Sequence, residues 1–401
     1  MSADVPTLAD VALRAGVAPE TLQEWVASGL VPAAPDGGLT AASVAQARMV
    51  ARLRERGHTL GQIRAATDSG RLAASYVEGL VAGPAPTWTL QDAARETGLE
   101  SELIERFFHA VGFGTHSTER LGDDDIELLR HAAAVLQAGF PLEAFLQLAR
   151  VFGQALSQIA DAEVRLFHLY VHEPLMRDGV AGWRVAEAME GLARQILPLA
   201  APIMDLIHQR FLQHFIQQDV IGHMEADFGI GDGSEHLLGR LRVGIAFADL
   251  AGYTRLTEEL GDEEAVQTVE RFVEEVTGTL PDDARIIKTI GDEVMVVGAD
   301  VVALVDWAAA LQEGYVNRRP LPRIGVHVGE ALYRDGDYYG REVNQAARVA
   351  ARAAGGEVLV TRPVVEAADR PGLEFERLGA VPLKGLREPI ELFVARRADP
   401  D

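Results

Sequence analysis

Charged residues lie at the ends and turns of apolar segments in the C-terminal part of the chain, where they could do chemistry. Lys288 and Asp292 flank the turn of a predicted β-hairpin, IIKTIGDEVMVV (Ile286–Val297). A lysine four residues before a carboxylate at a turn is most simply an exposed salt bridge. A second carboxylate favours a functional site instead, because Asp249 ends the apolar run Val243–Leu250 and carboxylates at the ends of buried strands usually face a site.

Further polar residues follow in two later segments. The stretch DYYGREVN begins at Asp337 and leads into a predicted helix, in which Asn344 and Arg348 are four residues apart and share a face. Another cation, Lys384, precedes a glycine in PLKGLREP. The number of such residues favours a binding site over a set of unrelated surface charges.

At these residues the chain resembles a known family. The segment from about Leu241 to Arg397 resembles the class III nucleotidyl cyclase catalytic domain: FADLAGYT, KTIGDE, RIGVHVGE, DYYGREVNQAAR and LKG occur in the family's order and spacing. Five separated motifs make a specific match, whereas one alone would be weak. The resemblance implies an adenylate cyclase, a phosphorus–oxygen lyase that converts ATP to 3′,5′-cyclic AMP and pyrophosphate.

The resemblance also implies roles for individual residues. Asp249 and Asp292 would hold two Mg²⁺ or Mn²⁺ ions, for which oxygen ligands are suited. Lys288 and Asp337 match the pair that selects the base, one donor and one acceptor directed at N1 and the exocyclic amine of adenine. The roles implied for the phosphate and ribose groups are ribose orientation by Asn344, stabilisation of the transferring phosphorus by Arg348, and binding of the triphosphate tail by Arg323 and Lys384.

In the family, the site lies between two catalytic domains. One supplies the residues matched by Asp249, Asp292 and Arg323, and the other those matched by Lys288, Asp337, Asn344, Arg348 and Lys384. This chain carries both sets once, so the resemblance implies a homodimer with two equivalent sites.

Composition sets further bounds. The 401 residues have room for two to three domains, and 48% apolar and 24% charged residues are ordinary for a globular protein. A formal net charge of -23 repels nucleic acid and anionic lipid, so we expect neither nucleic acid nor a membrane as a partner. The chain has no cysteine, no secretory signal pattern and no apolar run that could span a membrane, which predicts a soluble, cytoplasmic protein.

The N-terminal part carries a repeated helical pattern. Residues 7–66 resemble a MerR-type helix-turn-helix, and a similar pattern restarts 82 positions later. The matching pairs are Thr7 and Thr89, Gly16 and Gly98, Trp25 and Phe107, Leu39 and Leu121, Gly57 and Gly139, and Leu60 and Leu142. A scaffold for protein contact or ligand sensing is favoured over DNA binding, because the basic cluster of the first copy is answered by acidic residues in the second. The basic cluster is Arg48, Arg52, Arg54, Arg56 and His58, and the acidic residues are Asp123, Asp124, Asp125 and Glu127.

A helical pattern continues from about Leu142 to Asp227, with breaks predicted near Pro174, at residues 178–179 and at Pro198–Pro202. The glycines at 229, 231 and 233 indicate a flexible linker, because no strand precedes them as a phosphate loop requires. The predicted domains are a helix-turn-helix-like unit (1–80), a second helical unit with a regulatory bundle (87–202), a linker helix and hinge (203–236) and the catalytic domain (237–401).

Ten of the eleven histidines precede the predicted catalytic domain, and only His327 lies within it. His168 and His172 are four apart on a helix; an ordinary structural pair is favoured over a metal site, because no third ligand is evident. The arrangement resembles mycobacterial-type adenylyl cyclases in which a helical N-terminal domain inhibits the cyclase at neutral pH and releases it in acid, and in which a fatty acid or lipid occupies the regulatory domain. This resemblance implies autoinhibition relieved by acid or lipid.

The expected fold class is α+β, a ferredoxin-like cyclase domain preceded by an all-α regulatory domain. Strands are predicted at 243–249, 285–290, 293–298, 321–328, 357–360, 373–379 and 390–396, and helices at 254–278, 300–316, 341–353 and 361–369. The alternative function is a transcription regulator whose cyclase-like domain only senses nucleotide.

Overall fold

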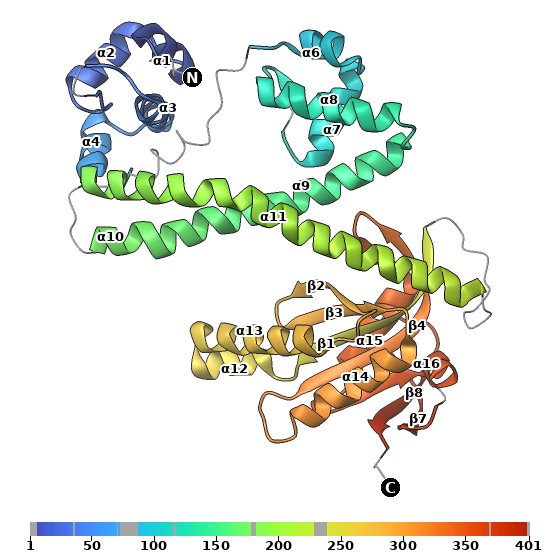
Figure 1. Ribbon diagram of the computed structural model, residues 1–401. Helices are drawn as coiled ribbons and strands as arrows, with labels where there is room; N and C mark the ends of the chain where they lie inside the picture. Colours follow the sequence, from blue (N-terminus) through green and yellow to red (C-terminus); the bar gives the residue numbers. More distant parts are fainter. Residues whose placement is uncertain are drawn as a thin grey trace. The chain divides into compact units, whose positions relative to one another are not determined.

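The computed structural model describes residues 6–34, 37–69, 71–72, 87–114, 118–177, 182–227, 239–368 and 370–398 (Figure 1). The chain divides into two compact units, Met1–Phe215 and Ile216–Asp401, which are described separately below. In the described ranges, no helix is both long and apolar enough to cross a membrane.

The first unit opens with two similar sets of helices. The first set is α1 (Leu8–Ala15), α2 (Pro19–Ala27), α3 (Ala41–Glu55) and α4 (Leu60–Asp68). The second set is α6 (Leu90–Thr97), α7 (Ser101–Val111), α8 (Asp123–Gln137) and α9 (Leu142–Phe167). Each helix of the second set begins 82 positions after its counterpart, as the repeated sequence pattern predicts, and each set encloses its own apolar core.

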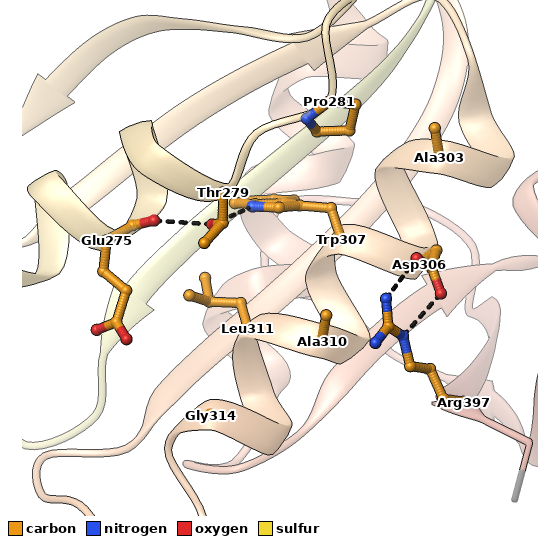
Figure 2. A pocket seen from close by; sticks show the side chains of 10 residues that line it. All are labelled: Glu275, Thr279, Pro281, Ala303, Asp306, Trp307, Ala310, Leu311, Gly314 and Arg397. Carbon is orange, nitrogen blue, oxygen red and sulfur yellow. Dashed lines mark hydrogen bonds and ion pairs between the residues drawn. The ribbon is translucent and has the colours of Figure 1, made fainter.

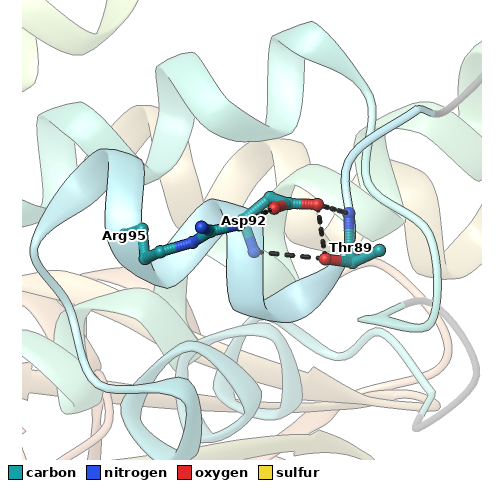
Figure 3. Close-up of polar contacts among 3 residues, drawn as sticks. All are labelled: Thr89, Asp92 and Arg95. Carbon is teal, nitrogen blue, oxygen red and sulfur yellow. Dashed lines mark hydrogen bonds and ion pairs between the residues drawn. The ribbon is translucent and has the colours of Figure 1, made fainter.

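The helix ends repeat as well. Thr89 caps α6 by accepting a hydrogen bond from the Asp92 backbone, while the Asp92 carboxylate accepts bonds from the Thr89 backbone and hydroxyl (Figure 3). Thr7 and Asp10 make the same reciprocal pair at the start of α1. Both helices end at a glycine with positive φ, Gly16 and Gly98, where a side chain would be strained. The two sets therefore share the local chemistry that starts and stops their helices.

The rest of the first unit is also helical. Gly153 of α9 lies so close to α7 that a Cβ there would be 1.9 Å from the Val111 carbonyl oxygen. After α9 come the short π-helical segment η2 (His168–His172) and α10 (Glu173–Arg177), so the helix changes its hydrogen bonding near Pro174 and does not break. Phe167 and Val171 pack against Val185 and Met189 of the next helix.

That next helix, α11 (Gly182–Asp227), extends from the first unit into the second. The interruption predicted at Pro198–Pro202 is wrong, because α11 contains both prolines. A proline removes one N–H donor and crowds the preceding turn, which bends a helix without requiring it to end. The predicted break at residues 178–179 and the glycine-rich hinge at 229–236 lie outside the described residues.

The second unit is built on one mixed sheet. Its strands are β1 (Arg240–Leu250), β2 (Arg285–Ile290), β3 (Glu293–Gly298), β4 (Pro322–Arg334), β5 (Asp337–Tyr339), β6 (Val358–Thr361), β7 (Leu373–Val381) and β8 (Ile390–Arg397). They lie in the order β2-β3-β1-β4-β6-β8-β7, with β5 paired to β4. The helices are α12 (Tyr253–Leu260), α13 (Asp262–Thr279), α14 (Val301–Gly314), α15 (Arg341–Arg352) and α16 (Arg362–Ala367).

Alternate residues of the central strands face two different cores. Ala246 and Ala248 of β1 point to a core shared with α13, α14 and α16, whereas Ile245 and Phe247 point to a core shared with α15. The sheet therefore has helices on both faces, and the α15 face is covered by that helix over β1 and β4.

The α+β class is confirmed, and every predicted strand is present, with shifts of up to three residues at its ends except for β4, which runs six residues beyond the predicted end at 328. Two details differ from the predictions. The helix predicted at 254–278 is two helices, α12 and α13, because Gly261 between them has φ +90°. The strand β5 was not predicted, since three residues after a tight turn give no recognisable alternation.

Candidate active site

Asp249 and Arg323 face each other across neighbouring strands. Their Cα atoms are partners in the β1–β4 register, and the Arg323 guanidinium donates hydrogen bonds from Nε (2.7 Å) and from a second nitrogen to Oδ2 of Asp249. Asp249 is 7% exposed. A buried carboxylate needs such a partner, because desolvation of an unpaired charge is costly. Both side chains lie on the α15 face of the sheet, since each alternates with residues of the opposite core.

Asp292 lies beside Asp249, in the turn between β2 and β3. Burial, together with a hydrogen bond to Asp249 and its negative charge, raises the pKa of Asp292 to about 7, and the charge of Arg323 opposes this shift. Two carboxyl groups this close do not readily ionise together without a cation. The donor set therefore fits a divalent metal ion. In the described ranges no cluster of three or more His, Cys, Asp or Glu side chains could hold a metal, so a bound ion would also need oxygens from phosphate or water.

Lys288 reaches the same face through a β-bulge. The register between β2 and β3 shifts between Ile286 and Lys288, so that Lys288 lies opposite Met295, a residue of the α15-face core. Lys288 Nζ donates a hydrogen bond of 2.5 Å to Oδ2 of Asp337, at the start of β5. The structure therefore brings together two residues that are far apart in the sequence, as the resemblance implied.

The remaining predicted residues are exposed. Asn344 and Arg348 lie one turn apart on the outer surface of α15, and Lys384 lies in the connection between β7 and β8. Among the site side chains, hydrogen bonds join Asp249 with Arg323 and Asp292, and Lys288 with Asp337. The predicted site residues therefore form two hydrogen-bonded groups, one around Asp249 and one of Lys288 with Asp337, beside the three exposed side chains.

Glu293 is a site residue that the sequence did not single out. Burial raises its pKa, the charge of Asp249 raises it further, and the charges of Arg323 and Arg348 lower it. Glu293 therefore lies within electrostatic reach of both the carboxylate pair and α15. The signal in the sequence was alternation: Glu293 is two residues before Met295 and shares its face.

A pocket of about 420 Å³ lies elsewhere, on the opposite side of the sheet (Figure 2). It is lined by α13 and α14, and in it the Trp307 indole N–H donates a hydrogen bond of 3.0 Å to the Thr279 hydroxyl. Trp307 belongs to the core on that side. None of the predicted site residues lines this pocket, so it is separate from the charged groups on the α15 face.

The mixed sheet with carboxylates, a lysine and an arginine on one face agrees with the nucleotidyl cyclase catalytic domain that the sequence motifs resemble. Two family models match the chain: the adenylate cyclase regulatory domain over residues 34–216, and the adenylate and guanylate cyclase catalytic domain over residues 240–396. A pH-sensitive adenylate cyclase of Mycobacterium tuberculosis is 31% identical over 367 residues, 88% of each chain. An adenylate cyclase of Streptomyces coelicolor is 30% identical, over 72% of this chain and 74% of its own.

Among solved structures, the adenylyl cyclase CyaB from P. aeruginosa is similar to 40% of this chain and 96% of its own, with 22% identity and a TM-score of 0.36. The family assignment rests on the sequence matches. The chain belongs to the adenylate cyclases in which this regulatory domain precedes a class III catalytic domain.

Proposed function

We propose that the protein converts ATP to 3′,5′-cyclic AMP and pyrophosphate in sites shared by two copies of the chain. The observation that carries the proposal is the gathering of the Asp249–Asp292 pair, the Lys288–Asp337 pair and α15 on one face of the sheet. When the ribose 3′-hydroxyl attacks the α-phosphorus, negative charge grows on the phosphoryl and leaving oxygens. A site that gathers cations there lowers the barrier.

Asp249 and Asp292 would hold two Mg²⁺ or Mn²⁺ ions, which supply charge neutralisation at the phosphates and lower the pKa of the attacking hydroxyl. Arg323 donates hydrogen bonds to Asp249 from two of its nitrogens, and its remaining N–H groups could donate to the triphosphate tail. Lys384, exposed in the loop before β8, would contact the same tail.

The Lys288–Asp337 pair would select the base. Lys288 donates one hydrogen bond to Asp337, which leaves N–H donors of its ammonium group for N1 of adenine. The Asp337 carboxylate can accept from the exocyclic amine. Guanine presents the opposite pattern at that edge, so the pair favours ATP over GTP. On α15, Asn344 would orient the ribose and Arg348 would stabilise charge on the transferring phosphorus.

The homodimer proposal rests on exposure. Asn344, Arg348 and Lys384 are exposed on a single chain, as expected if a second copy completes the site. The long helix α11 also exposes large apolar side chains, among them Leu206, Phe211 and Ile216. Apolar surface of this extent on a soluble chain is typical of a protein interface.

We also propose that the helical N-terminal region restrains the cyclase and that acid releases it. The relative from M. tuberculosis is named pH-sensitive. Here the rings of His168 and His172 are joined by a hydrogen bond of 3.0 Å between their Nδ1 atoms, in η2, and His172 is 4% exposed. In that bond one Nδ1 donates and the other accepts, so the bond would be lost if both Nδ1 atoms carried a proton.

The N-terminal helical sets bear on two further partners, nucleic acid and lipid. The helix-turn-helix-like sets would serve as a scaffold and not as a DNA reader, because Arg48 and Arg54 of the basic cluster donate hydrogen bonds to the backbone carbonyls of Arg14 and His58. For the lipid, a pocket of about 240 Å³ beside Phe108 and Phe113 in the second set is a candidate location.

The test is cyclic AMP formation from ATP with Mn²⁺ at pH 5.5, 6.5 and 8, for the full chain and for a truncated chain starting at Gly229. We expect the full chain to gain activity in acid and the truncated chain to be active throughout. Equal activity of both at every pH would refute the restraint by the N-terminal region. Silence of both with either metal, and with GTP, would favour the nucleotide-sensing regulator.

A further inference from the structure

On the face of β4 that α15 covers, a buried histidine lies between two glycines. Gly325, His327 and Gly329 alternate along the strand toward α15, and His327 is 2% exposed. A Cβ at Gly325 would lie 2.1 Å from the backbone nitrogen of Ala350, and one at Gly329 would lie 2.8 Å from Cγ of Glu342. The two glycines let α15 lie close to β4 at both ends of the helix. Between them, His327 is the large side chain that β4 directs at α15.

The histidine ring is held at both nitrogens. Nε2 lies 2.6 Å from Oε2 of Glu342 in the first turn of α15, and Nδ1 lies 2.7 Å from the hydroxyl of Thr361, which is fully buried at the end of β6. A carboxylate accepts, so the neutral ring donates a hydrogen bond from Nε2 and accepts one from the Thr361 hydroxyl at Nδ1. Through these two hydrogen bonds, His327 of β4 joins α15 to both β4 and β6.

We infer that His327 is a positioning residue for the cyclase reaction: through Glu342 it fixes how α15 sits on the sheet. Asn344 and Arg348 follow Glu342 by two and six residues on the same helix, so the seating of α15 fixes where both side chains point. The inference rests on the proposed roles of these two residues. Burial lowers the pKa of His327 while Glu342 raises it, which agrees with a neutral ring that donates to a carboxylate.

The structure also predicts which kinetic constant changes. Lys288, Asp337 and Arg323, which would bind the base and the triphosphate, lie on strands and not on α15. A shift of α15 therefore changes the placement of the reacting groups with little change in ATP binding. Misplacement of about 1 Å can cost on the order of 100-fold in rate. The expected signature is a fall in kcat at nearly constant KM.

The decisive comparison is between two substitutions in the full chain, assayed with ATP and Mn²⁺ at pH 5.5. His327→Gln places an amide N–H near the Nε2 position and keeps a donor for Glu342, whereas His327→Asn is too short to reach it. We expect kcat to fall about tenfold or more for His327→Asn and within about threefold for His327→Gln, with KM changed by less than about threefold in both. Adding Glu342→Gln to His327→Asn should lower kcat little further, because the two residues act through the same hydrogen bond.

Trp307→Phe is the matched control, because it removes a buried hydrogen bond on the opposite side of the sheet. It should lower thermal stability and leave kcat unchanged. If His327→Asn, when folded, keeps the wild-type kcat, or if kcat and KM change together, the inference is wrong. If the unaltered chain makes no cyclic AMP, the proposed function fails instead, and backbone hydrogen exchange decides the inference: amides of α15 should exchange faster in His327→Asn than in His327→Gln.

Discussion

At the scale of single residues, the carboxylate pair combines a proposed catalytic role with a cost to stability. Asp292 has a pKa of about 7 beside Asp249, well above the ordinary value for aspartate. The unfolded chain has no such neighbour, so the folded state favours the protonated form. The stability that this proton confers is complete in acid, below the ordinary pKa, and is lost as pH rises through 7.

We therefore predict that Asp292→Asn stabilises the metal-free protein at pH 8 and not at pH 4. The amide carries no charge, so it removes the repulsion that appears above pH 7. After allowance for solvent screening, the gain is on the order of 1 kcal/mol, or about 2–4 °C in the thermal midpoint of a unit the size of Ile216–Asp401. Thermal melts in EDTA check it, with Asp282→Asn, an exposed carboxylate before β2 and away from the β2–β3 turn, as the control. A gain that is the same at both pH values would contradict the shared-proton explanation.

The pair proposed to select the base gives a second prediction at this scale. Lys288→Ala removes the donor proposed for adenine and leaves Asp337 without its cation. We expect kcat/KM for ATP to fall by about tenfold or more, and the preference for ATP over GTP to fall with it. Competition between the two nucleotides in one assay measures the ratio. Arg396→Ala, at an exposed position of β8 where the arginine pairs with Glu376, should change neither value.

At the scale of elements, the site depends on how closely α15 lies on β4. Gly325 permits a contact between strand and helix backbones that no side chain would allow. The same strand carries Arg323 to Asp249 and His327 to Glu342, so one element positions both the carboxylate group and the helix. An error in this contact would displace Asn344 and Arg348, the two proposed site residues that α15 carries.

Gly325→Ala should therefore be strongly damaging. A methyl group 2.1 Å from a backbone nitrogen forces α15 off the strand, and overpacking of this kind costs about 1–3 kcal/mol or more. We expect a lower thermal midpoint and a loss of cyclase activity of at least tenfold. Gly278→Ala in α13, where no atom lies within 4 Å of the new Cβ, should leave activity intact and stabilise slightly. Similar effects of the two substitutions would show that the close contact is unimportant.

At the scale of the whole molecule, the proposed shared site predicts complementation. Asp249→Asn and Arg348→Ala should each abolish activity, because each removes one of the two sets of residues from every site. In a mixed dimer, one of the two sites receives only unaltered residues. Equal co-expression makes half of the dimers mixed, so we expect activity to return to roughly a quarter of that of the unaltered protein. Activity measurements on the purified mixture check this, and no recovery in a verified mixed dimer would argue for sites within one chain.

The sequence by itself determined the α+β class, all strands of the sheet except β5, and the repeat at 82 positions that the helix bounds follow. It could do so because apolar periodicity, glycines and caps act locally along the chain. The continuity of α11 through two prolines was missed, since a proline bends a helix and its neighbours decide whether the helix continues.

The site itself divides between sequence and structure for a similar reason. Motifs located Asp249, Lys288, Asp292 and Asp337 because their spacing matches a family. Only the tertiary structure decided that a bulge turns Lys288 toward Asp337, that Arg323 pairs with Asp249 across two strands, and that the one histidine of the catalytic domain ties α15 to the sheet. Register and helix seating depend on contacts between residues distant in the chain, and no local pattern encodes them.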